Sequence, residues 1–84
     1  SPPSVAPELL FEIAQTLEEQ HAATAAAIYR LLAGRHPTRP EAEKSLAKLA
    51  HLCRERLERP DEAARCLDEL ARRYPDSAVL GSAG

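Results

Sequence analysis

Apolar residues recur along this chain at intervals of three and four positions, the spacing of one face of an α-helix. Four such stretches are separated by proline, glycine and polar residues, which begin or end helices. The pattern predicts helices over about residues 7–20, 21–34, 40–57 and 60–74. Two interpretations fit residues 76–80, a loose turn or the start of a further helix. We therefore expect an all-α fold.

Each predicted helix has one apolar stripe, which we expect to face the core. In chain order the stripes are Leu10, Ile13, Ala14 and Leu17; Ala25, Ile28, Tyr29 and Leu32; Leu46, Leu49, Ala50 and Cys53; and Ala63, Cys66, Leu67 and Leu70. Pro7 and Pro60 suit the first turn of a helix, because the N–H that proline lacks would be unpaired there in any case. The loops inside the two helix pairs are short, so each pair should form an antiparallel hairpin.

The two predicted hairpins are related by an internal repeat. The first helix of each carries the same series of large residues around a small one, at Ala14 and again 36 positions later at Ala50. The second helix repeats with an offset of 38, opening on Ala25 or Ala63 and closing on a proline. We expect the inner loop to account for the difference between the two offsets.

These spacings resemble the tetratricopeptide repeat, in which a unit of about 34 residues pairs a helix A with a helix B and closes on proline. The resemblance implies a short right-handed α-solenoid of two stacked hairpins, at residues 7–37 and 38–77. The ends have linker composition, and we interpret residues 1–6 as a linker and 78–84 as a flexible tail. The ending Arg73-Tyr74-Pro75-Asp76-Ser77 also resembles repeats of bacterial members, which implies a bacterial source.

The resemblance also implies a function, because such repeats are in general binding scaffolds without chemistry of their own. Helix A residues line a concave surface that holds a partner peptide or helix, so the chain is expected to be a non-catalytic protein–protein interaction module. The expected partner-binding residues are Phe11, Gln15, Lys44, Lys48, His51 and Arg54. The same face carries Ala47 and an acidic row, Glu8, Glu12 and Glu18. The alternative is a solvated face on which Glu–Lys pairs contribute about 0.2–0.5 kcal/mol each.

Members of the family that bind a C-terminal carboxylate carry basic residues one turn apart, as at Lys44 and Lys48. The first row lacks the Lys and Asn that such members have and offers Phe11 and Gln15 instead. Phe11 lies off the apolar stripe, where it is either an exposed anchor for a partner or the flank of the core.

A second function from another class is homo-oligomerisation within a larger, possibly membrane-associated, bacterial protein. Two repeats leave outer helix faces uncovered, because solenoids usually need about three units or a cap. Leu9, Leu31 and the pair Val79–Leu80 lie off the regular stripes and could close a homodimer.

Composition and charge exclude other classes. Alanine and leucine dominate the apolar residues of this 84-residue chain, with 16 and 12 copies against three aromatic residues. The net charge of −2 is too balanced for a nucleic-acid binder, and no apolar run of about 20 residues predicts membrane insertion. The compartment stays open between the cytoplasm and a soluble domain of a membrane protein.

The sequence offers no candidate for catalysis, and we expect neither a cofactor nor a metal. Cys53 and Cys66 do not match zinc-ligand spacing and are interpreted as small buried hydrophobic residues. His51 and Cys53 lie two positions apart, hence on different faces of one helix. The three glycines are isolated, so no loop cradles a phosphate.

Overall fold

A computed structural model describes residues 5–82, so the outer parts of the predicted linker and tail, residues 1–4 and 83–84, lie outside it. The described chain consists of helices and their connections, which confirms the all-α prediction. The helices are α1 (Pro7–Leu17), α2 (Ala22–Arg35), α3 (Pro40–Glu55), α4 (Pro60–Arg73) and the short α5 (Ala78–Ser82).

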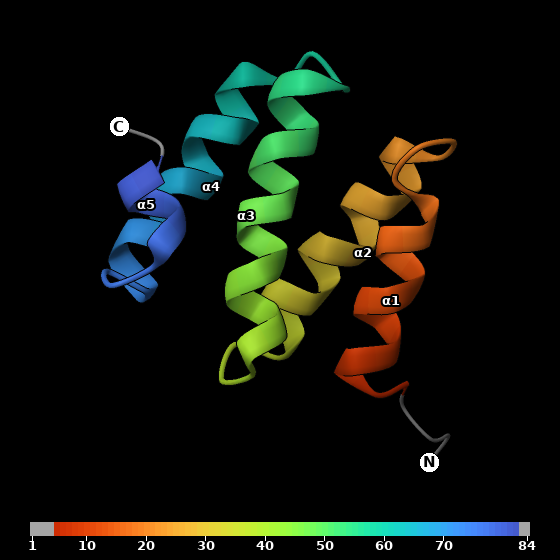
Figure 1. Cartoon of the computed structure of the whole chain (residues 1–84), viewed down its shortest axis with the longest axis horizontal. Helices are drawn as coiled ribbons and strands as arrows, with labels where there is room; N and C mark the ends of the chain where they lie inside the picture. Colours follow the sequence, from red (N-terminus) through yellow and green to blue (C-terminus); the bar gives the residue numbers. More distant parts are fainter. Residues whose placement is uncertain (1–4, 83–84) are drawn as a thin grey trace.

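The helices form a single row of stacked hairpins. Each of α2, α3 and α4 packs on the helix before it, whereas α1 and α3 touch only lightly, and α5 lies against α4 (Figure 1). The molecule is correspondingly flat, with extents of 42 × 28 × 17 Å. This is the hairpin stack that the internal repeat predicted. No helix within residues 5–82 is long and apolar enough to cross a membrane.

Two helix ends differ from the prediction, and they explain the two repeat offsets. α1 ends at Leu17 and residues 18–20 form a turn, while α3 ends at Glu55 rather than near 57. The inner loops, residues 18–21 and 56–59, are therefore equal in length. The expectation of unequal loops was wrong: the extra residues of the second unit extend α3 itself.

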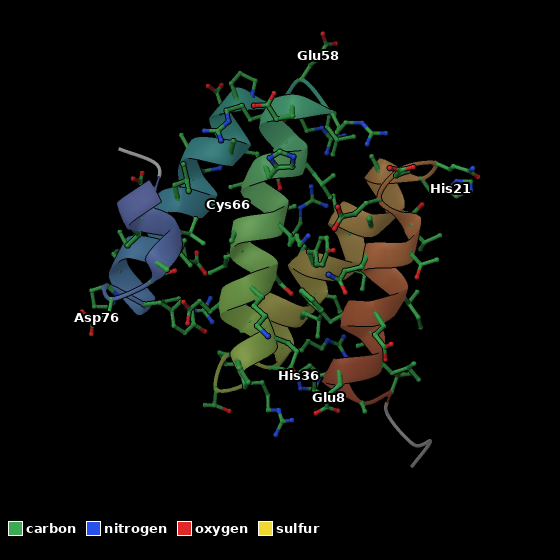
Figure 2. The ribbon with its side chains drawn as sticks, in the orientation of Figure 1. Glu8, His21, His36, Glu58, Cys66 and Asp76 are labelled. Atoms are coloured by element: carbon green, nitrogen blue, oxygen red, sulfur yellow. The ribbon has the colours of Figure 1, made fainter. Side chains whose placement is uncertain are left out.

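The second inner loop contains a backbone conformation that side chains disfavour. Glu58 has φ of 53°, in the left-handed region that costs an L-residue roughly 1–2 kcal/mol. Figure 2 shows its side chain projecting from the end of the hairpin. The N–H of the next residue, Arg59, donates to the carbonyl of Cys53 at 2.7 Å, which closes the end of α3.

The turns that follow α2 and α4 have the same geometry. His36 and Tyr74 adopt nearly equal backbone angles (φ −127° and −136°, ψ 55° and 66°), and each N–H donates to the carbonyl four residues back. α5 then begins three residues after Pro75, as α3 begins three residues after Pro37. Residues 78–82 are therefore helical, which agrees with the second of the two interpretations of this segment, and α5 begins at the register at which α3 begins.

Small residues lie where the helices touch. Ala14, Ala25, Ala50 and Ala63 are each at most 3% exposed, as expected for positions where one helix must approach another closely. They belong to one core cluster with the fully buried Tyr29. A smaller cluster joins α2, α3 and α4 to α5; its members are Ala33, Leu46 and Leu70, with Leu67, Tyr74, Val79 and Leu80 packed against them.

The stripe of α1 is the least accurate part of the core prediction. Ile13 is 39% exposed, although the stripe placed it inside. Its counterpart in the second unit, Leu49, is 2% exposed because α3 has a neighbour on both sides. α1 has no helix before it within the described chain, so part of its apolar surface faces solvent.

Candidate partner-binding groove

The first helices of successive units line one open hollow. Its volume is about 610 Å³, and its lining residues are Phe11 and Gln15 of α1, Lys44, Ala47, Lys48 and His51 of α3, and Val79 of α5. No residue of α2 or α4 contributes to it. The hollow forms because α2 separates α1 from α3 on one side of the row, leaving a gap between the two first helices on the other.

Phe11 forms a firm part of the groove rather than a free anchor. Its side chain is half-buried and packs on the core, with its ring centroid 5.6 Å from that of Tyr29 and the planes tilted by 57°. Tilted rings at this separation attract each other. Of the two interpretations of Phe11, the structure therefore supports a residue at the flank of the core, although one side of the ring still reaches the hollow.

A polar chain continues from Tyr29 to the groove rim. The Tyr29 hydroxyl donates to the Glu18 carboxylate, which also lies 3.5 Å from the Lys48 ammonium. Burial and the adjacent Glu18 raise the pKa of Tyr29, so the phenol stays protonated and remains a donor. These contacts join α1, α2 and α3 and fix the orientation of Lys48.

The acidic row of α1 is largely occupied by contacts within the chain. Glu8 pairs with Arg39, and Glu18 pairs with Lys48. Lys44 is exposed, and no ion pair engages it in the described part of the chain. The alternative of a solvated face with Glu–Lys pairs therefore describes Lys48 but not Lys44.

The structure brings five of the six predicted partner-binding residues together and leaves one apart. Phe11, Gln15, Lys44, Lys48 and His51 share the hollow, whereas Arg54 is not in its lining and lies 3.4 Å from Glu55. The hollow stops short of Arg54 because α1 ends at Leu17. Val79 also lines the hollow, whereas the sequence pattern had suggested it only as a possible dimer contact.

A second hollow, of about 280 Å³, lies between α2 and α4 over Leu46 and Leu49 of α3, and charged side chains of α2 and α4 border it. Arg30 donates two hydrogen bonds to the Glu62 carboxylate, at 2.6 and 3.0 Å, and hydrogen bonding to Arg30 is the main reason that the pKa of Glu62 is lowered. Cys66 borders this hollow, and burial raises the pKa of its thiol to about 11. A thiol that holds its proton at neutral pH is a poor nucleophile.

Cys53 and Cys66 are free and buried, as the sequence predicted. Within residues 5–82 no group of three or more His, Cys, Asp and Glu side chains could hold a metal ion.

The fold defines a class of structure, the helical repeat built from stacked hairpins. Comparison with protein families agrees, since residues 44–77 match the model of the tetratricopeptide repeat. This part of the chain, most of the second hairpin, is similar to a tetratricopeptide repeat, and such repeats are typically non-catalytic modules that bind other proteins. Comparison with curated proteins and with solved structures found no match.

Proposed function

We propose that the groove formed by α1, α3 and α5 binds a peptide segment of a partner protein. The observation that carries the proposal is the convergence of aromatic, amide and cationic side chains from three helices on one hollow. Its volume of about 610 Å³ falls within the range of ligand sites, roughly 300–1,000 Å³. Aromatic residues held in place by the core are the kind that dominate binding energy.

The groove is largely formed before a partner arrives, which favours binding. Phe11 is packed on Tyr29, and Lys48 is held by Glu18. Binding of a partner therefore does not have to order these side chains. Ordering a side chain that is free beforehand costs about 0.5–1.5 kcal/mol.

The proposal is tested by selecting binders from a random peptide library displayed on phage and measuring the affinity of synthetic copies. Phe11→Ala and Lys48→Glu together should weaken the selected peptides by about tenfold or more. The matched control is Arg65→Ala on the exposed side of α4, which should leave affinity unchanged. Equal losses in both variants, or no loss in either, would refute the groove as the binding site.

Self-association through the outer face of α1 is the second candidate function. Leu9 and Ile13 are 50% and 39% exposed, whereas their counterparts in α3, Ser45 and Leu49, are buried. Leu31 is exposed as well, at 41%. Val79 and Leu80 do not support a dimer, because they pack against the cluster of Ala33, Leu46 and Leu70 in their own chain.

Light scattering over a concentration series distinguishes the candidates. A mass that rises with concentration and returns to the monomer value in Leu9→Glu would support self-association. A constant monomer mass would contradict it and leave the peptide groove standing.

A further inference from the structure

The charges in the groove are of one sign. The α3 wall contributes the cationic side chains of Lys44 and Lys48, and the α1 wall contributes the uncharged Phe11 and Gln15. Of the acidic residues of α1, Glu8 is bound to Arg39, and Glu12 lines a separate hollow with Leu9 and Ile13. Glu18 offsets part of the charge of Lys48, but Lys44 has no such partner in the described chain. A ligand that places acidic groups here gains attraction without displacing an ion pair at Lys44.

The spacing of the two lysines determines how far apart two carboxylates of a ligand should lie. Lys44 and Lys48 lie four residues apart on α3, which corresponds to about 6 Å along the helix axis. Two carboxylates on alternate residues of an extended peptide lie on the same side of it, about 6.6 Å apart. An acidic residue, any residue and a second acidic residue therefore match the two ammonium groups.

The remainder of the lining is apolar and comes from three helices. Phe11 of α1, Ala47 of α3 and Val79 of α5 meet in the same hollow. In an extended peptide the residue between the two carboxylates points away from the lysines of α3, so a large apolar side chain at that position can lie against Phe11 on the α1 wall. Burying such a side chain contributes more than any of the exposed charges, so the charges provide selectivity rather than most of the affinity.

We infer that the groove selects an acidic peptide segment in which two carboxylates two residues apart accompany one large apolar side chain. The inference rests on the proposed function and names the chemistry of its partner. The segment is internal rather than a chain end, because α1 offers the amide of Gln15 and no cation to hold a terminal carboxylate. Gln15 can instead exchange hydrogen bonds with the peptide backbone.

The test measures binding of labelled synthetic peptides by fluorescence anisotropy. The parent peptide has the core Asp-Leu-Asp between glycines, with both ends blocked. Companion peptides carry Asn-Leu-Asn, Asp-Ser-Asp or Lys-Leu-Lys, and one version of the parent has a free C-terminal carboxylate. We expect each carboxylate to strengthen binding about two- to fivefold, and binding to weaken as salt rises from about 0.01 M to about 0.15 M.

Charge reversal gives the sharpest variant. Lys44→Glu with Lys48→Glu should invert the preference, so that Lys-Leu-Lys binds better than Asp-Leu-Asp. The matched control is Arg65→Glu with Arg72→Glu on α4, which makes the same change of net charge away from the groove and should keep the original preference. All four residues carry exposed charges, and thermal unfolding of each variant verifies that it is folded.

The outcomes separate the inference from the proposed function. Equal affinity for Asp-Leu-Asp and Asn-Leu-Asn would overturn the acidic ligand, while loss of both in Phe11→Ala would still support a peptide groove. Binding only of the peptide with a free C-terminus would overturn the internal segment. Failure of all peptides to bind, or inversion of the preference in the control variant, would overturn the inference as a whole.

Discussion

Tyr29→Phe isolates the hydrogen bond that ties the core to the groove. The substitution removes one hydroxyl and leaves the ring in place against Phe11. A hydrogen bond to a charged group contributes about 1.5–3 kcal/mol. Since the Glu18 side chain is 20% exposed and keeps Lys48 as a partner, we expect the lower end, a loss of about 1.5 kcal/mol in the free energy of unfolding. In a domain of this size that corresponds to a fall in Tm of about 6–12 °C.

The assay is thermal and urea unfolding followed by circular dichroism. Tyr74→Phe is the matched control, because the Tyr74 hydroxyl donates to the uncharged carbonyl of Pro37 at 2.7 Å in an exposed position and accepts only a long hydrogen bond, of 3.3 Å, from Arg73. Its loss should cost only about 0.5–1 kcal/mol. A double-mutant cycle of Tyr29→Phe with Glu18→Gln should give a coupling of about 1 kcal/mol. The reasoning is refuted if Tyr29→Phe costs no more than Tyr74→Phe, or if the cycle shows no coupling.

Three further predictions follow from the packing and titration of named residues. Leu49→Ala should cost about 2–5 kcal/mol, while Ile13→Ala at the equivalent but exposed position should cost under about 1 kcal/mol in the same urea experiment; equal costs would contradict the uncovered face of α1. Glu58→Gly should raise stability by about 0.5 kcal/mol in urea unfolding, because relief of the positive φ exceeds the added entropy of the unfolded chain; a loss would show that this loop is not strained. The raised pKa of Tyr29 lies above its value of about 10 in the unfolded chain, so its contribution to stability is complete below pH 10 and is lost as pH rises further. The stability of Tyr29→Phe, measured by urea unfolding between about pH 9 and 11, should therefore decline less than that of the natural chain, and parallel curves would contradict the shift.

Helical periodicity predicted the architecture because each unit repeats the same local signals. The prolines at both ends of the units and the paired alanines fixed the number of helices and the contacts between them. The pattern after Pro75 also allowed a further helix to begin there. These features depend on neighbours in sequence, so no knowledge of distant contacts was needed.

The predictions that failed concern exposure and groove lining, which depend on helices that are distant in the sequence. A stripe shows which side of a helix is apolar but not how many helices cover it, and Ile13 lies on a side that nothing covers. Arg54 has the spacing of a groove residue, yet α1 ends before it can face Arg54. Val79 was missed in the opposite way, because its role in the groove arises only once α5 folds back onto α4.

The groove also changes the meaning of the low aromatic content. Of the three aromatic residues, Phe11 and Tyr29 are in ring contact beneath the hollow, so two of the three serve one site. A single supported ring beside two lysines is consistent with a modest-affinity peptide site.

The most direct test of the central claim is to map peptide binding by NMR on the isotopically labelled chain. Titration with the blocked Asp-Leu-Asp peptide should shift the amide signals of α1, α3 and α5 around Phe11, Ala47 and Val79, with saturation, and should leave the exposed side of α4 unchanged. Shifts confined to α4 or to the outer face of α1 at Leu9, or no saturable shift anywhere, would contradict the account.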